Sequence, residues 1–286
     1  RAARSTEAEA EPVEKKRIWS RRRAGTDRTF AALQRVLAVA FQFVLVAVLL
    51  WGAWALIHLL IALPISAADH DDYIHVFLAL LASFGRTSAA VLLGVVWTLP
   101  VGIAIGLSSR WSRRLQPIIQ VVASFPAPMV FPLVVMLLLI LHIPFTIGCI
   151  ALMLLGAQWY ILFNVIAGAT AIPADLKEVT SVYNLSRYQR WTKLYLPCVF
   201  PYLLTGLVTA AGGAWNATIV AEYMKFRSQN FTAFGLGSMI CLAQDQGNYP
   251  LLTAAVVTMA LAVVLINRLI WKRLYRLAED RYSLMT

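Results

Sequence analysis

The stretch that decides the fold is KEVTSVYNLSRYQRWTKLYLP, which runs from Lys177 to Pro197. It is rich in charged and aromatic residues, whereas the chain on either side of it is almost wholly apolar. A membrane-spanning helix needs roughly 20 apolar residues, and both flanks are long enough to supply them. We therefore interpret this stretch as an ordered segment outside the hydrocarbon, between two membrane spans.

The composition of the whole chain supports a membrane protein. Hydrophobic residues make up 60% of it and charged residues 14%, against roughly 25% charged residues in soluble domains. Residues 1–29 are polar and are expected to form a cytoplasmic tail or linker, and 30–286 a single transmembrane domain. The expected fold is an all-α integral membrane protein with about six transmembrane helices, at about 33–64, 87–108, 118–141, 144–167, 198–224 and 249–271.

The distribution of basic residues predicts the orientation of these spans. Lysine and arginine gather in the loop 109–116, in the segment 173–197 and at both ends of the chain, whereas the loop 65–86 is acidic. Short cytoplasmic loops carry the excess of Lys and Arg. We therefore expect both termini and the segment 173–197 to be cytoplasmic. The net charge of +11 has the same origin and does not indicate nucleic-acid binding.

The segment 173–197 carries signals for two short helices joined by a turn. Pro173 suits a first helical turn, and Asn184 suits the left-handed residue after a helix end. Ser186 and Gln189 match a capping box, which predicts a second helix that runs until Pro197 disturbs it. An apolar stripe is expected at Leu176, Val179 and Tyr183. An ordinary amphipathic connector lying in the headgroups is the alternative.

These residues resemble a signature of permease subunits of ATP-binding-cassette (ABC) importers. That signature is Glu-Ala-Ala, a Gly four positions later, and Ile-x-Leu-Pro after nine more residues. In this chain Val179 and Thr180 stand where the family has alanines, and Asn184 stands for the Gly. The resemblance implies that an ATPase subunit docks on this cytoplasmic coupling segment, through Glu178, Val179, Thr180, Asn184, Ser186, Leu194, Leu196 and Pro197.

Further motifs narrow the resemblance to permeases of the nitrate, sulfonate, taurine and bicarbonate type. The likeness covers about 75–286 and rests on Arg86, Pro100, Gly102, Pro126, Pro128, Pro132, Trp215 and the pair Ala221-Glu222. It implies the permease subunit of an ATP-driven importer, which forms the translocation path for a small polar, anionic solute. It also implies a multi-pass protein of the bacterial inner membrane.

The partners follow from the same resemblance. The sequence has no G-x-x-x-x-G-K-S/T phosphate loop, so we expect no enzyme activity on this chain and an ATPase on another polypeptide, which binds ATP and Mg. A second permease half, as a homodimer or a fused copy, and a periplasmic or lipid-anchored solute-binding protein are also implied. The three cysteines and four histidines show no ligand spacing, so no cofactor or metal is expected here. Since the first residue is arginine rather than methionine, we expect a piece or trimmed product of a longer chain.

Polar residues within the spans are candidates for the translocation path, because such residues often face a cavity or a partner helix. They are Gln158, Asn164, Asn216 and Glu222. For the first three, interhelical hydrogen bonding is the alternative, and Glu222 could instead pair with Lys225 or Arg227 at the interface. The prolines of the third span indicate either a broken helix or a simple kink. Gly102 and Gly106 are expected to let two helices approach closely.

Two other classes of protein remain open at this point. An ion-coupled secondary transporter is the leading alternative, although no pair of interrupted spans with midmembrane carboxylates is apparent. A membrane scaffold that only recruits a partner is the other. The sequence names no solute.

Overall fold

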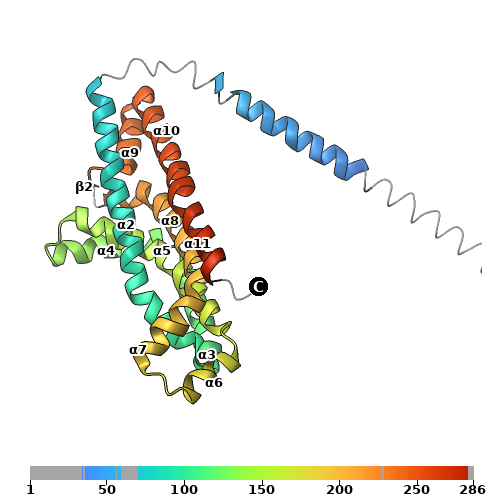
Figure 1. The fold of residues 1–286 in the computed structure, drawn as a ribbon. Coiled ribbons are helices and arrows are strands. Elements are labelled where there is room, and N and C mark those ends of the chain that lie inside the picture. Colours follow the sequence, from blue (N-terminus) through green and yellow to red (C-terminus); the bar gives the residue numbers. More distant parts are fainter. Residues whose placement is uncertain (1–33, 35, 56, 59–69, 227–228, 283–286) are drawn as a thin grey trace, which may run out of the picture. The chain divides into compact units, whose positions relative to one another are not determined.

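The computed structural model describes residues 34–282, apart from positions 35, 56, 59–69 and 227–228 (Figure 1). The chain divides into two compact units, Arg1–Leu63 and Pro64–Thr286, which are described separately. In the first unit, the helix over Val36–Ala55 is long and apolar enough to cross a membrane. The predicted polar tail 1–29 lies outside the described residues.

The second unit is a helical bundle centred on three long helices. α5 packs along both α2 and α8, and α9, α10 and α11 pack around them. Figure 1 shows α3, α6 and α7 at one end of this bundle and α9 at the other. The elements are α2 (His70–Gly106), α3 (Ser109–Ala123), α4 (Ala127–Ile140), α5 (Phe145–Thr170), α6 (Ala174–Val182), α7 (Arg187–Arg190), η2 (Trp191–Tyr195), α8 (Leu196–Ala221), β1 (Tyr223–Phe226), β2 (Gln229–Thr232), α9 (Leu236–Gln246), α10 (Tyr249–Ile266), η3 (Asn267–Trp271) and α11 (Lys272–Tyr282).

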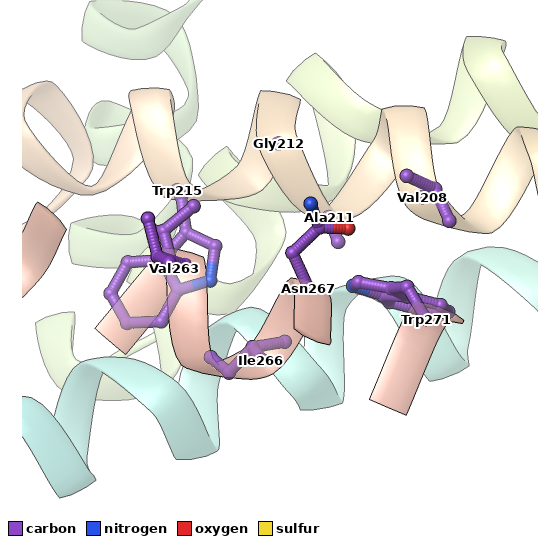
Figure 2. A pocket seen from close by; sticks show the side chains of 9 residues that line it. Val208, Ala211, Gly212, Trp215, Val263, Ile266, Asn267 and Trp271 are labelled. Atoms are coloured by element: carbon purple, nitrogen blue, oxygen red, sulfur yellow. The ribbon is translucent and has the colours of Figure 1, made fainter. Parts of the chain in front are cut away.

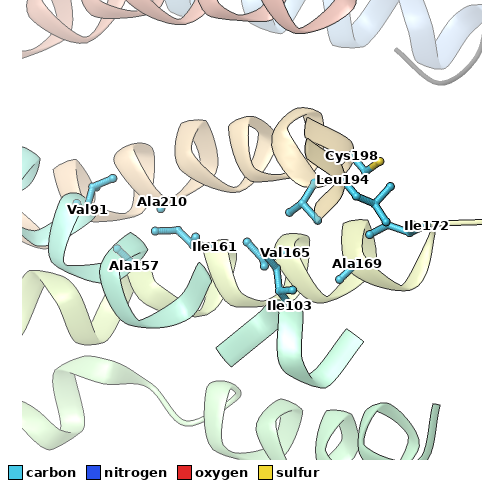
Figure 3. Packing of buried hydrophobic residues seen from close by; sticks show 12 residues of the cluster. Val91, Ile103, Ala157, Ile161, Val165, Ala169, Ile172, Leu194, Cys198 and Ala210 are labelled. Atoms are coloured by element: carbon cyan, nitrogen blue, oxygen red, sulfur yellow. The ribbon is translucent and has the colours of Figure 1, made fainter. Parts of the chain in front are cut away.

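The core lies where α2, α5 and α8 meet (Figure 3). Val165 and Ala169 of α5 are fully buried there beside Ile103 of α2. The two helices come close because glycines face α5. A Cβ atom on Gly102 would lie 2.6 Å from Val165 Cγ1, and one on Gly106 would lie 2.6 Å from Ala169 Cβ. The prediction of a close helix approach at these glycines is confirmed.

Five described helices are long and apolar enough to cross a membrane, or up to six if the bent pair α3 and α4 counts as one span. The predicted span 87–108 is too short, because the spanning helix runs over Asp72–Gly106. The same prediction places Arg86 at the end of the loop 65–86. It lies inside α2, and the apolar run before it belongs to the same span.

The predicted third span, 118–141, is a broken helix. α3 and α4 are separated by three residues and bent by 80°. Pro126 is the N-cap of α4 in an extended conformation, with ψ at 113°. A residue before proline, here Phe125, also avoids the helical conformation. The structure therefore favours a break over a kink, and the expected loop 109–116 is the first half of α3.

The described residues of the expected outer loop 225–248 form a hairpin and a helix, and the hairpin departs from an all-α fold. β1 and β2 form an antiparallel hairpin in which Tyr223 faces Thr232 and Met224 faces Phe231. Phe231 packs on Phe145 at the start of α5, with ring centroids 5.7 Å apart. The hairpin is followed directly by α9. The last span also exceeds its predicted end at 271, because α10 continues through the π-helical turn η3 into α11.

Candidate functional site

The segment 173–197 forms two short helices that project from one end of the bundle (Figure 1). Pro173 caps α6, and Asp175 lies in its first turn, where a carboxylate favours the helix dipole. Asn184 has a positive φ of 47°, the left-handed conformation predicted for it. Ser186 and Gln189 form both bonds of the capping box. The local prediction of helix, turn and helix is confirmed.

The second of these helices does not end at Pro197. α7 continues through the π-helical turn η2 into α8, so Arg187–Ala221 is one helix of 35 residues. The backbone N–H of Leu196 bonds to Trp191 O, five residues back. Pro197 has no N–H to donate, and a wider turn before it accommodates that loss at the start of α8. The projecting segment is therefore continuous with a membrane span.

The side chains of this segment divide into a buried set and an exposed set. Thr180 is 6% exposed and Leu194 is 7% exposed, and Leu176 packs against the main core. The expected single apolar stripe is wrong, because Val179 and Tyr183 point to the exposed side. The structure adds residues that periodicity alone had not singled out. The exposed surface includes Glu178, Val179, Val182, Tyr183, Asn184, Ser186 and Tyr188.

At the other end of the bundle, a buried ion pair joins α2 to the end of α8. Arg86 Nη1 lies 2.7 Å from Glu222 Oε1, and Glu222 is fully buried. The carboxylate also accepts hydrogen bonds from Ser83 Oγ at 2.8 Å and from the Gly237 backbone N–H at 2.9 Å. Among the described residues, Lys225 pairs with Asp245 instead, and Arg227 lies outside them. The predicted pairing of Glu222 with Lys225 is therefore wrong.

This cluster also holds the start of α9. Leu236 N–H donates to Ser83 Oγ at 2.8 Å, and Arg86 Nη2 donates to Phe234 O at 2.7 Å. Ser83 and Glu222 thus cap the first two N–H groups of α9, Leu236 and Gly237 respectively, at a helix end where the dipole favours an anion. A buried charge is tolerated when it is paired and hydrogen-bonded. We call these residues, Ser83, Arg86, Glu222 and the backbone 234–237, the outer ion-pair cluster, because they lie away from the end of the bundle that carries α6 and α7 (Figure 1).

The remaining polar candidates occupy two environments. Gln158 is buried on the side of α5 that faces Gly94 of α2. Asn164 lies where α5 meets α8, beside Gly206, and its amide donates to Tyr160 O at 2.8 Å. Asn216 is exposed on α8. The structure therefore does not bring all four candidates together.

Asn216 belongs to an exposed polar stripe along α8. Thr205, Thr209 and Gly212 precede it at intervals of four, three and four residues, so they share one side of the helix. The two threonine hydroxyls donate to carbonyls of their own helix, which leaves oxygen lone pairs available. Tyr160 of α5 packs on Gly213 beside this stripe. We call Thr205, Thr209, Gly212 and Asn216 the α8 stripe, which is exposed and lies next to α5.

A lateral groove lies between α8 and the α10–α11 helix (Figure 2). It has a volume of about 220 Å³ and is lined largely by apolar side chains, among them Trp215 and Trp271. Asn267, the first residue of η3, contributes its amide. Apart from the indole N–H groups of the two tryptophans, this amide is the one polar side-chain group that lines the groove, and with no cationic side chain the groove has no built site for an anion.

The hairpin is tied to α9 by an exposed charged cluster. Asp245 accepts hydrogen bonds from Lys225 Nζ at 2.8 Å and from Tyr223 OH. The bond from Lys225, followed by that from Tyr223, lowers the pKa of Asp245 below its usual value. The same carboxylate raises the pKa of Lys225 and that of Tyr223. The cluster presents a fixed, polar surface at the α9 end of the bundle.

Comparison with known families decides the membership of the chain. Residues 98–283 match the model of the binding-protein-dependent transport system inner membrane component. The chain belongs to this family. It is thus a multi-pass membrane protein of the transporter permease class, and the matched residues include the projecting segment, the α8 stripe and Glu222.

Relatives of this permease transport different anions according to their names. It is 29% identical over 194 residues to the nitrate import permease protein NrtB of Leptolyngbya laminosa, covering 68% of this chain and 66% of the relative. The bicarbonate transport system permease protein CmpB of Synechococcus elongatus is 27% identical over 66% of this chain and 65% of its own length. The aliphatic sulfonates transport permease protein SsuC of Bacillus subtilis, whose printed name marks that function as putative, is 32% identical over 57% and 55%. The chain spans about half to two thirds of such relatives.

Solved structures show the same fold. A chain of the MetNI methionine ABC transporter in an inward-facing conformation superposes with a TM-score of 0.60 at 18% identity, over 74% of this chain and 99% of that one. A chain of a bacterial ABC transporter that imports the acidic polysaccharide alginate gives a TM-score of 0.56 at 17% identity, over 90% and 100%. The architecture of the permease is therefore that of ABC importer permeases.

Proposed function

We propose that this permease is the membrane subunit of an ATP-driven importer and forms part of the path for a small polar anion. The observation that carries the proposal is the projecting segment 173–197, which exposes a compact surface at one end of the bundle and continues into α8. Membership of the family and the named substrates of the relatives support an importer of an anion such as nitrate, bicarbonate or a sulfonate.

The exposed surface of α6 and α7 is the proposed docking site of a separate cytoplasmic ATPase, which supplies ATP and Mg. Glu178, Val179 and Tyr183 would contact that subunit. Thr180 and Leu194 are buried and would instead hold the segment to the bundle. Because α7, η2 and α8 form one helix, a displacement of the docked segment would move α8. ATP binding would then bias two arrangements of the bundle by its differential affinity for them.

The remaining parts of the assembly follow from the proposed orientation. With α6 and α7 in the cytoplasm, the hairpin and α9 face the opposite side, where a periplasmic or lipid-anchored solute-binding protein would dock. Both termini are cytoplasmic in this arrangement, and the membrane is the bacterial inner membrane. A second permease half, identical or fused, would complete the path, with Asn164 and Asn216 on the exposed polar side of each half. Gln158 and Glu222 would contribute to the path only through a rearrangement, since both are buried in this conformation.

The test is to purify the chain from its native membrane in mild detergent and to identify the proteins that accompany it. The proposal expects a stoichiometric subunit with a phosphate loop, and ATP hydrolysis that depends on the solute-binding protein. Glu178→Lys should detach or uncouple this subunit while the permease stays folded, because Glu178 is exposed. Asp280→Lys, which makes the same charge reversal at an exposed position of α11 away from both proposed docking surfaces, is the control.

Two results would overturn the proposal. One is solute-dependent hydrolysis that Glu178→Lys leaves unchanged. The other is a chain that purifies alone and moves nitrate down an imposed ion gradient in vesicles, which would identify a secondary carrier.

A further inference from the structure

α3 carries a second polar stripe that the functional assignment above does not use. Arg113, Gln116, Gln120 and Ser124 follow one another at intervals of three and four residues, and all but the partly buried Gln116 are exposed. Such spacing places them on one side of the helix. Leu115 and Ile119, on another side, pack on α5 against Leu162 and Ile166.

This stripe extends to the level of the midpoint of α5. Phe125, just after α3, lines a hollow with Leu155 and Trp159 of α5. These two residues lie ten and fourteen positions into α5, which begins at Phe145 and has 26 residues, so they are near its midpoint. Gln120 and Ser124 are therefore at about the depth where a lipid-facing polar group is most costly.

The end of α3 adds unpaired backbone groups at the same depth. The break before α4 turns the chain by 80°. Ser124 N–H and Phe125 N–H bond back into α3, but within the described residues no donor reaches the carbonyl oxygens of Ser124 and Phe125. Irregular backbone at membrane depth occurs only where it is buried in protein or lines a water-filled cavity.

Helix geometry turns this stripe toward the α8 stripe. Around α5, Asn164 faces α8, Gln158 faces α2 and Leu162 faces α3, and the exposed Ala167 lies between the α8 and α3 sides. α3 runs opposite to α5. Because α3 is a right-handed helix with Leu115 and Ile119 against α5, Gln120 points to the side of the bundle on which Ala167 lies. The apolar Val122 points to the side on which α2 lies. Polar residues of α3, α5 and α8 thus share one side of the bundle.

We propose that the α3 stripe (Arg113, Gln116, Gln120 and Ser124) lines the aqueous path of the transported anion, opposite an equivalent wall from the second permease half. This proposal rests on the proposed function and adds residues to its path. The helices α3, α5 and α8 contain no Asp or Glu, and Arg113 places a positive charge at the end of the stripe near α6. A neutral polar wall that ends in a guanidinium suits an anion rather than a cation.

The test uses single cysteines in the complete complex, held in membrane vesicles. Gln120→Cys and Ser124→Cys probe the stripe, and Ile118→Cys and Val122→Cys probe the exposed apolar side of the same helix. Cys241→Ser forms the background, since Cys149 and Cys198 are buried. The probes are water-soluble methanethiosulfonates of similar size, one anionic and one cationic, with nitrate as the protecting anion.

The expected result is that the two stripe variants react at least roughly tenfold faster than the two apolar-side variants, since only water carries these probes to a thiol. Nitrate should slow the reaction, and the anionic probe should react faster than the cationic one. Arg113→Gln should remove that charge preference.

Equal reaction on both sides of α3 would overturn the proposal. Stripe variants that do not react with either probe would also overturn it. The same holds if oxidation joins the stripe cysteines of two copies of the chain directly, because a protein contact would then occupy the position assigned to water. Hydrolysis of ATP is measured on the same samples. If the stripe is inert and hydrolysis still responds to solute, only the lining assignment fails. If no ATPase accompanies the chain, the proposed function fails whatever the labelling shows.

Discussion

Removing the negative charge of the outer ion-pair cluster should loosen the start of α9 by a measurable amount. In wild type, Glu222 accepts bonds from Arg86, Ser83 and the Gly237 N–H. Glu222→Gln replaces one acceptor oxygen with an NH2 group. That group must then face Arg86 and the Gly237 N–H, which can only donate, or the Ser83 hydroxyl, whose oxygen already accepts from the Leu236 N–H. Arg86 is left as a buried charge without a counterion. Breaking a buried pair in this way costs about 3–5 kcal/mol.

The free-energy change converts to a ratio that hydrogen exchange can measure. At about 1.4 kcal/mol for each factor of ten, it predicts roughly a hundred- to several-thousand-fold faster exchange at the amides of Leu236 and Gly237. These two amides report the cluster directly, since they donate to Ser83 and Glu222. The assay is hydrogen exchange with mass spectrometry on the purified complex, with α5 peptides as the internal reference.

A double-mutant cycle separates pairing from packing. Arg86→Met combined with Glu222→Leu removes both charges, and replacing a buried pair by apolar residues is often neutral. The amides of Leu236 and Gly237 should therefore exchange more slowly in the double variant than in Arg86→Met or Glu222→Leu alone. Exchange within twofold of wild type in Glu222→Gln, or additive effects in the double variant, would refute the reasoning.

Three further predictions concern other parts of the bundle. Gly102→Ala should lower the free energy of unfolding by about 1–3 kcal/mol through overpacking. Gly85→Ala is the control, because a Cβ atom there would meet nothing within 4 Å. Equal melting temperatures of the two variants would contradict the close helix approach. Asn184→Gly should preserve the turn between α6 and α7, whereas Asn184→Ala should destabilise that turn by about 1–2 kcal/mol because of its positive φ. The destabilised turn should be cleaved faster in limited proteolysis. Identical cleavage of the two variants would argue against that conformation. The Lys225–Asp245 pair should stabilise the hairpin equally from about pH 5 to pH 9. The pKa of Asp245 is lowered, so the stabilisation is lost only at more acidic pH, and the pKa of Lys225 is raised, so it is otherwise lost only at alkaline pH. A change in hydrogen exchange of the hairpin near neutral pH, after correction for the intrinsic rate, would disprove this.

Local signals in the sequence predicted the projecting segment well. Asn184 and the capping box of Ser186 and Gln189 depend only on neighbouring backbone groups, so a short stretch of sequence contains all that determines them. The disturbance predicted at Pro197 is a π-helical turn after which the helix continues, because proline is also favoured at the start of a helix. A π-helical turn before it is not visible in residue types alone.

The outer ion-pair cluster shows why the span boundaries were less predictable. The sequence predicts Arg86 at the end of a loop, and Glu222 either in the translocation path or paired at the interface. They are 136 positions apart, and only the packing of α2 against α8 and α9 brings them together. The same limit applies to the candidate path. Asn164 and Asn216 were identified by polarity, but polarity could not tell them from the buried Gln158, and the α3 stripe was hidden in what had been read partly as a loop.

The distance along the chain between Arg86 and Glu222 also has a consequence for biosynthesis. The ribosome adds about 5–20 residues each second, so α2 reaches the membrane roughly 7–27 s before the carboxylate that neutralises its arginine. During that time the guanidinium must stay at the water interface or in the protein-conducting channel. We therefore expect α2 to reach its final position only after α8 and the start of α9 have been synthesised, although α2 itself is made much earlier.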